Sequence, residues 1–450
     1  MSGFLHRREL LQAGCSGYLG LTLPGLMARQ ASASSVSAPA RSVVLVFLTG
    51  GGSHIDTFDP KPDSSEIKGE FSPIGTRVTG VRFTELLPKL ADRADRFAIV
   101  RSMSHNDNRH LSGTHNTLTG EPQIFRGNSN EDKELNRDDS PSYGSAVAHL
   151  SPPVDGIPGQ VTLPNPLIEG NLTWPGQHAG FLGPKYDPLQ VIGGSGETSF
   201  QLHGMQLPDG LSVQRVATRH KLLQALNNSE KDPDRWAEHQ SFNEHQKVAY
   251  TMLTSSRLVD AMRIEDESQA TRDDYGDHGM GKTLLLARRL VEAEVPVIQC
   301  NMGTVQTWDN HEGIFGKLKD RLLPQLDQSL SALLDDLQRT GLLDETLVIA
   351  VGEFGRTPRI SRLRPDAAVG RDHWAWAYSA LFAGAGVRGG QLIGATDRHG
   401  KYTITPPFHP NDLGATVYHS LGIDPASTVH DRQGRPLPLN RGTVMSELFS

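Results

Sequence analysis

The stretch TLVIAVGEFGRTPRI, residues 346–360, decides the fold. Five apolar residues, from Leu347 to Val351, lead through a glycine into Glu353. A short apolar run bounded by turn residues is typical of a strand that is buried on both faces, as in a parallel sheet. Ligands of such sheets bind beyond the carboxyl ends of the strands. The carboxylate of Glu353 therefore marks a strand end where a functional site is expected.

Similar apolar runs recur along the chain and alternate with helical patterns. The other predicted strands are SVVLVF (42–47), FAIV (97–100), VPVIQCN (295–301) and YSALFAGAG (378–386). Helical periodicity is found in residues 84–96, 282–294 and 313–340, and Pro324 is expected to kink or divide the last of these. This alternation predicts an α/β fold, with a mostly parallel central sheet and helices on both faces.

The first 33 residues have the pattern of a twin-arginine signal peptide. Arg7 and Arg8 precede an uncharged, mostly apolar stretch, and ASAS offers a cleavage site after Ala33. The apolar stretch is short for a membrane span and is interrupted by Pro24, so no stable span is expected. We expect a periplasmic or secreted protein; a frayed N-terminal helix is the alternative. Residues 34–450 are predicted to form one domain, with a loop-rich insertion at about 121–200.

Composition excludes one large class of function. The formal net charge is −7 and the body of the chain has no basic run, which argues against a nucleic-acid partner. The chain has two cysteines, and cleavage after Ala33 would leave only Cys300, so no disulfide is expected within the mature chain.

One motif resembles a nucleotide-binding loop, but the residues before it do not fit that role. Residues 276–283 read GDHGMGKT, which fits the pattern of a phosphate-cradling loop. That loop requires a buried strand before it, whereas the preceding DESQATRDDY is polar and acidic. The sequence therefore predicts no nucleotide binding here.

Acidic residues and histidines follow four of the predicted strands. In chain order the sets are His54, Asp56 and Asp59; His105, Asp107, His110 and His115; Asp309 and His311; and Glu353, with the pair Asp372 and His373 before the next strand. Carboxylates mixed with imidazoles suit a divalent transition metal, Zn or Mn in preference to Ca.

Each of these residues has an ordinary explanation when it is taken alone. Asp309 could cap a helix that begins near Gly313, and Glu353 could form a structural ion pair with Arg356. The joint pattern favours one shared metal or anion site. Three arginines near the strand ends are suited to holding an anion: Arg101, Arg109 and Arg356. Tyr402 is expected to pack, and Trp374 and Trp376 are expected to pack or to line the mouth of the site.

The succession FLTGGGSHIDTFDPKP, IVRSMSH, WDNHEG, GEFGRTPRI, GRDHW and DLGATVYHSLGID resembles the family DUF1501 over nearly all of the predicted mature chain. That family looks like a branch of the alkaline phosphatase and sulfatase superfamily. The resemblance implies an alkaline-phosphatase-like fold with a metal site at the strand ends. It implies the metal ligands Asp56, Asp309, His311, Glu353 and His373, with Asp372 as a ligand or as an orienting partner.

The resemblance also bears on catalysis. Counting back from Thr119-Gly120 places the superfamily's nucleophile near His110, with Ser112 and Thr114 close by, but no Cys-x-Pro-x-Arg signature is present. His110 would be the nucleophile or an acid/base, and Arg356 would hold the anion. The implied function is an exported, metal-dependent hydrolase of phosphate or sulfate esters. The alternative is a non-catalytic binding protein of the same fold for a sulfated or anionic polysaccharide or a partner protein.

The export signal gives the first testable prediction. N-terminal sequencing of the exported protein should begin near Ser34, because the ASAS motif presents its small residues to the signal peptidase. Replacing both Arg7 and Arg8 with lysine should leave the protein in the cytoplasm. An exported protein that begins at Met1 or Ser2 would contradict the prediction.

Overall fold

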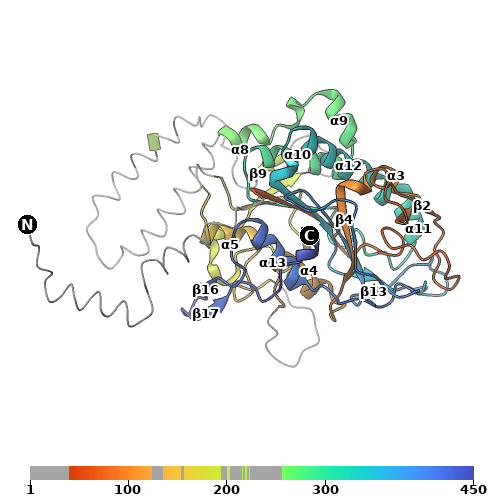
Figure 1. Ribbon diagram of the computed structural model, residues 1–450. Helices are drawn as coiled ribbons and strands as arrows, with labels where there is room; N and C mark the ends of the chain where they lie inside the picture. The colour runs from red at the N-terminus through yellow and green to blue at the C-terminus, as the bar shows by residue number, and fades with distance from the viewer. Residues whose placement is uncertain are drawn as a thin grey trace, which may run out of the picture. The chain divides into compact units, whose positions relative to one another are not determined.

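The computed structural model describes residues 40–123, 135–153, 157–193, 200–202 and 256–450, with a few helical residues between 215 and 222 (Figure 1). The described residues belong to one compact unit, Pro39–Ser450. The predicted signal peptide lies outside the described residues.

Nine of the described strands form one central sheet. Its order is β15-β4-β14-β11-β1-β10-β5-β8-β9. The strands are β15 (Leu392–Ile393), β4 (Phe97–Met103), β14 (Tyr378–Ala383), β11 (Thr346–Val351), β1 (Ser42–Phe47), β10 (Val297–Asn301), β5 (Gln160–Leu163), β8 (Leu189–Gly193) and β9 (Phe200–Leu202). β1 lies between β10 and β11 and is parallel to both, while β14 and β9 are antiparallel to their neighbours. The predicted mostly parallel sheet is confirmed.

The central strands are apolar on both faces because both faces are covered. Along β1, Val44 and Val46 belong to one hydrophobic cluster, and Val43, Leu45 and Phe47 belong to another. Successive side chains of a strand point to opposite faces, so the two clusters lie on the two sides of the sheet.

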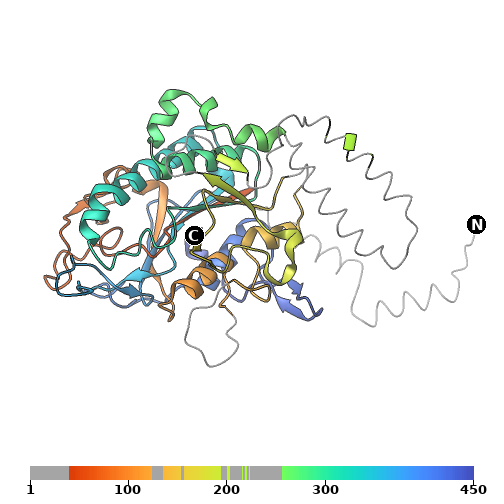
Figure 2. The same cartoon turned by 180° about the vertical axis from the view of Figure 1, so that it is seen from behind.

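Helices cover both of these faces (Figures 1 and 2). The first cluster packs against α3 (Pro88–Ala91), α8 (Ser256–Ala261), α9 (Gln269–Tyr275), α10 (Gly279–Glu292), α11 (Ile314–Lys317) and α12 (Leu323–Arg339). The second packs against α4 (His110–Thr119), α5 (Tyr143–Leu150) and α13 (Pro410–Ser420). The predicted covering of the sheet by helices on both faces is confirmed.

Two prolines decide where predicted helices begin and break. The long helix is divided, since a π-helical turn, Leu318–Leu322, joins α11 to α12 just before Pro324, which lacks a backbone N–H. The helix predicted for residues 84–96 is confirmed only in its second half, as α3 and a 3-10 turn at Ala94–Arg96. Thr84 ends a strand, and the helix α3 begins only at Pro88, because a proline disfavours helical geometry at the residue before it.

The loop-rich region at about 121–200 also supplies part of the sheet. It contains α5, β5 and β8, and a short ribbon of β6 (Ile168–Glu169) and β7 (Leu172–Thr173). The other short ribbons pair β2 (Pro73–Gly75) with β3 (Arg82–Thr84), β12 (Gly355–Arg356) with β13 (His373–Trp374), and β16 (Thr428–His430) with β17 (Pro436–Pro438).

The GDHGMGKT segment forms the junction between two helices. Helix α9 precedes it, and the side chain of His278 accepts a hydrogen bond from Gly281 N at the start of α10. Lys282 Nζ lies 2.7 Å from a carboxylate oxygen of Asp277. The strand that a phosphate-cradling loop requires is therefore replaced by a helix.

Two further findings concern the core and the surface. Cys300 is buried in β10, and burial raises the pKa of its thiol. Within the described ranges, no helix is both long enough and apolar enough to cross a membrane.

The buried face of α12 gives a prediction of stability. Leu330 is wholly buried in the first cluster, so Leu330→Ala should lower the free energy of unfolding by about 2–5 kcal/mol. Urea unfolding followed by circular dichroism measures the change. Leu363 is 64% exposed, and Leu363→Ala should change stability by less than about 0.5 kcal/mol. Equal effects of the two variants would contradict this placement of the core.

Candidate metal centre

The strand ends meet at one edge of the sheet. The strands β1, β4, β10 and β11 run in the same direction, so their carboxyl ends lie at the same edge. The loops after them carry Gly50, His110, Asp309 and Glu353. The antiparallel strand β14 begins at this edge, so the preceding segment brings His373 there as well.

Asp309 is the centre of the cluster. Its Oδ1 lies 3.0 Å from His311 Nε2 and 3.2 Å from His373 Nε2, and its Oδ2 lies 3.2 Å from His110 Nε2. Arg356 Nη1 lies 2.5 Å from Oδ1. Asp309 therefore does not serve as a helix cap; the residue before α11 is Gly313.

Each of the three imidazoles is held from behind at Nδ1. His110 Nδ1 lies 2.8 Å from Glu353 Oε1, His311 Nδ1 lies 2.8 Å from Asp372 Oδ1, and His373 Nδ1 lies 2.8 Å from the carbonyl oxygen of Asn108. These oxygens accept hydrogen bonds, so each Nδ1 carries a proton and each Nε2 faces the site, where it donates to Asp309 when protonated and offers its lone pair when not. Such outer partners fix the ring orientation of histidines that bind metals.

The donor set fits a divalent cation. One ligand atom each from His110, Asp309 and His373 lie within 4.8 Å of one another, and His311 Nε2 lies 3.0 Å from His373 Nε2. Three imidazole lone pairs that face one carboxylate repel each other unless a proton or a cation lies between them. Nitrogen and carboxylate donors together suit Zn or Mn better than Ca.

The close approach of these ionisable groups shifts their pKa values. Burial alone would raise the pKa of Asp309, but hydrogen bonds from three imidazoles and the charge of Arg356 hold it well below its usual range. Burial alone would lower the pKa of His110, but hydrogen bonds to Asp309 and Glu353 outweigh it and raise the pKa to about 9. Burial lowers the pKa of His373, and the neighbouring charges of His110 and Arg356 add to the effect.

Glu353 lies behind His110. Its side chain is fully buried; Oε1 faces His110 and Oε2 accepts a hydrogen bond of 3.1 Å from Gly50 N. Gly50 has a φ of +105°, and a Cβ there would lie 2.6 Å from Asp309 N, so only glycine fits this close approach. Glu353 and Arg356 form no ion pair with each other, since Arg356 pairs with Asp309.

Arg356 is used entirely within the protein. Its guanidinium is fully buried and donates to the carbonyl oxygens of Gly50, Gly51, Trp308 and Arg371 as well as to Asp309. All five of its N–H groups have partners, so the group fixes the loops and presents no free donor to an outside anion. The other two predicted anion-holding arginines are also paired, Arg101 with Asp59 and Arg109 with Asp107.

Asp56 lies apart from the imidazoles. Arg371 grips both of its oxygens, at 2.8 and 3.2 Å, and Ser53 Oγ donates to it at 2.5 Å. The two side chains are almost completely buried. A buried ion pair of this kind accounts for Asp56 without a metal.

Two residues of this region, Asn108 and Arg371, were not predicted from the sequence. Asn108 accepts from His373 Nδ1 with its main chain and from Ala375 N with its side chain, and Arg371 holds Asp56. Both stand next to predicted site residues, Asn108 beside Asp107 and Arg371 beside Asp372, but neither residue type predicts its partner from spacing alone.

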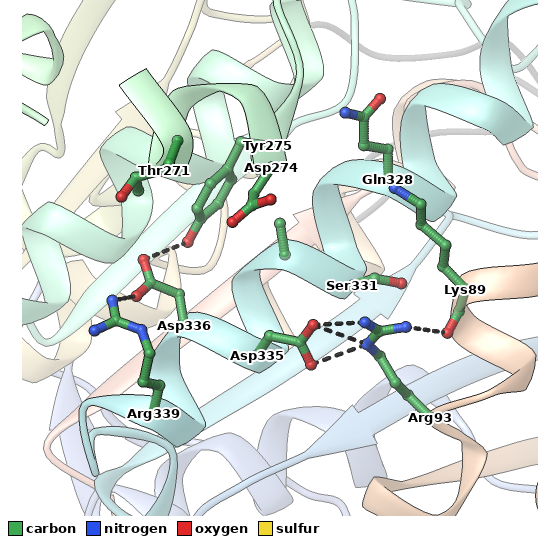
Figure 3. A pocket seen from close by; sticks show the side chains of 12 residues that line it. Lys89, Arg93, Thr271, Asp274, Tyr275, Gln328, Ser331, Asp335, Asp336 and Arg339 are labelled. Carbon is green, nitrogen blue, oxygen red and sulfur yellow. Dashed lines mark hydrogen bonds and ion pairs between the residues drawn. The ribbon is translucent and has the colours of Figure 1, made fainter. Parts of the chain in front are cut away.

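A cavity of about 390 Å³ between α3, α9 and α12 shares no lining residue with the cluster (Figure 3). Four of its charged groups form two pairs. Arg93 grips Asp335 through two nitrogens, and Asp336 binds both Arg339 and the hydroxyl of Tyr275. These pairs are part of the packing between the helices that line the cavity.

Substitution distinguishes a carboxylate that forms a buried ion pair, as proposed for Asp56, from one that binds a metal. Asp56→Asn should lower the free energy of unfolding by about 3–5 kcal/mol, because it leaves the buried guanidinium of Arg371 without a counter-charge. It should leave the metal content unchanged. Asp260→Asn, in the exposed pair with Arg263, should cost about 0–1 kcal/mol. Loss of metal from the Asp56→Asn protein, measured by mass spectrometry, would restore Asp56 as a ligand.

Comparisons with known proteins give a family and a set of distant structural likenesses. The structure of Ps i-CgsB in complex with k-i-k-neocarrahexaose shares 12% identity at a TM-score of 0.40, covering 90% of this chain and 75% of that one. The alkaline phosphatase from the Antarctic bacterium TAB5 shares 12% at 0.36, covering 85% and 98%. The PsFucS1 sulfatase from Pseudoalteromonas sp. shares 10% at 0.36, covering 85% and 68%.

These TM-scores are all below 0.5. No curated protein matches the chain. The model of the family described as "Protein of unknown function (DUF1501)" matches residues 40–449, and the chain therefore belongs to DUF1501.

Proposed function

We propose that this protein is an exported, metal-dependent hydrolase of phosphate or sulfate esters. One observation carries the proposal: three imidazole Nε2 atoms converge on the carboxylate of Asp309, with a hydrogen-bond acceptor behind each ring. The ester class comes from the resemblance of the sequence to the alkaline phosphatase and sulfatase superfamily.

Asp309, His110 and His373 are the proposed metal ligands, with His311 as the fourth candidate. Glu353 and Asp372, both predicted as ligands, are assigned to the support of His110 and His311, because their oxygens bind the Nδ1 atoms of those rings. A bound divalent metal would supply a Lewis acid that neutralises charge on the ester oxygens and acidifies water.

The chain's own residues prepare this chemistry. Glu353 and Asp372 hold the protons on Nδ1 of His110 and His311, so that both rings present Nε2 to the site. Arg356 orients Asp309 from within the protein. The ring of His110 packs against Trp174 and Phe354, with centroids 5.4 and 5.0 Å away, and these rings help to shield it from water.

The attacking group would be water, because the predicted nucleophile His110 is here a proposed metal ligand and its Nδ1 is bonded to Glu353. The side chains that contact Asp309 are three imidazoles and one guanidinium, so the described residues bring no hydroxyl or thiol to that carboxylate. The same feature favours the second candidate, a binding protein that holds an anionic polysaccharide without cleaving it.

Metal analysis tests the proposal most directly. The purified protein should contain one divalent transition metal, and His373→Ala should lower both the bound metal and the melting temperature, because metal binding adds to the free energy of folding. His430→Ala, at an exposed histidine of the β16–β17 ribbon, is the matched control and should change neither. Glu353→Gln should weaken metal binding about 10–100-fold, as expected for an outer partner of a metal-binding histidine. Unchanged metal content in His373→Ala would contradict the proposal.

Hydrolysis assays separate the enzyme from the binding protein. The metal-loaded protein should hydrolyse p-nitrophenyl phosphate or p-nitrophenyl sulfate, lose the activity on chelation, and regain it with Zn or Mn. A protein that holds metal but cleaves neither ester would support the non-catalytic alternative.

A further inference from the structure

An aromatic surface lies next to the segment that carries His373. Trp374 and Trp376 both lie against Tyr402, with ring centroids 5.6 and 6.4 Å from that of Tyr402. Trp376 is 41% exposed and Tyr402 is 45% exposed. Large aromatic rings left open to solvent in this way are typical of binding surfaces. These three residues are called the aromatic platform below.

Hydrogen bonds hold the platform in place before any ligand binds. Tyr402 belongs to a hairpin in which Asp397 N donates to Tyr402 O and Ile404 N donates to Ala395 O. Trp374 Nε1 donates to Lys401 O at 2.5 Å, which joins the hairpin to β13. His54 Nε2 lies 2.7 Å from Gly400 O and holds the turn of the hairpin against the loop after β1. Binding to such a preformed surface requires little ordering of side chains.

One short segment serves both the platform and the metal centre. His373 turns toward Asp309, whereas Trp374 turns toward Tyr402, as expected for successive residues of a strand. Asn108 pins this segment twice, through His373 Nδ1 and through Ala375 N. A ligand bound to the platform therefore contacts the same chain segment that carries His373 to the metal centre. The platform and the metal centre lie on opposite sides of the β12–β13 ribbon.

The charges around the platform favour an anionic ligand. Lys401 Nζ lies 5.6 Å from the ring centroid of Trp374 and 5.3 Å from that of Tyr402, and Arg398 is exposed at the turn of the same hairpin. The one carboxylate of the turn, Asp397, already accepts hydrogen bonds from His399 N and Lys401 N. Cations beside amphipathic rings suit a ligand that has both apolar faces and negative groups.

We infer that the platform binds the sugar rings of a sulfated polysaccharide. The C–H face of a pyranose stacks on Trp376 or Tyr402, and its sulfate groups pair with Lys401 and Arg398. The inference rests on the proposed function for the ester class and names the substrate: a sulfated polymer long enough to reach from the platform to the metal centre.

Binding of three polymers tests the inference. Dextran sulfate carries sugar rings and sulfate, dextran carries only the rings, and polyvinyl sulfate carries only the charge. Affinity electrophoresis should show the wild-type protein retarded most by dextran sulfate. Trp376→Ala and Tyr402→Ala should each weaken that binding about tenfold, as expected for an exposed aromatic anchor. Trp376→Phe should keep most of the affinity, and Leu363→Ala, at an exposed apolar residue of another loop, should keep all of it.

The outcomes are distinguishable from a failure of the proposed function. Binding is measured on chelated protein and on Asp309→Asn, so it does not depend on a bound metal or on hydrolysis, and metal content is measured for every variant. Ring-dependent binding by these proteins supports the platform even if no ester is cleaved. The inference is overturned if wild-type protein does not bind dextran sulfate, if the alanine variants bind it unchanged, or if polyvinyl sulfate binds equally well. It is also overturned if Trp376→Ala converts a dimer to a monomer, which would make the platform a self-association surface.

Discussion

The buried guanidinium of Arg356 is the interaction on which the arrangement of the strand ends depends. It joins the loop after β1, through Gly50 and Gly51, to the loop after β10, through Trp308, and to the segment before β13, through Arg371. It also holds Asp309. A charge with no exposure to water is tolerated only when every hydrogen bond is made, so the loops are fixed relative to one another as the condition for burying the arginine.

This constraint explains how four distant segments form one cluster. A carboxylate that is gripped by a fixed arginine cannot turn away, and the three imidazoles are each fixed by a separate acceptor. The site is therefore built in layers: a positive group beneath, the carboxylate of Asp309 upon it, and a ring of imidazole nitrogens around the carboxylate. The geometry favours the cation-binding role whether or not the chain is an enzyme.

The sequence predicted the fold better than it predicted the roles of single side chains. Apolar runs identified the strands that carry the site, because burial on both faces leaves a pattern that needs no knowledge of partners. The same runs placed four site residues at strand ends: Asp309, His311, Glu353 and His373. The direction of the strands brings these residues together. The partners themselves lie up to about 300 residues apart and depend on rotamers and on close approaches such as Gly50 to Asp309, so spacing could not show that Arg356 faces inward or that Arg371 holds Asp56. The helix predicted for residues 84–96 begins later than expected for a local reason, since Pro88 limits where it can begin.

The position of β1 has a consequence for how the chain folds. The first strand of the sheet pairs with β10 and β11, whose residues are more than 250 positions later in the sequence. During synthesis the apolar segment SVVLVF must therefore wait for most of the chain before either of its edges is covered. Pairings of such high contact order are slow to form and leave a strand exposed to aggregation meanwhile. A chain of this topology gains from completing its folding in the compartment where chaperones can shield that strand.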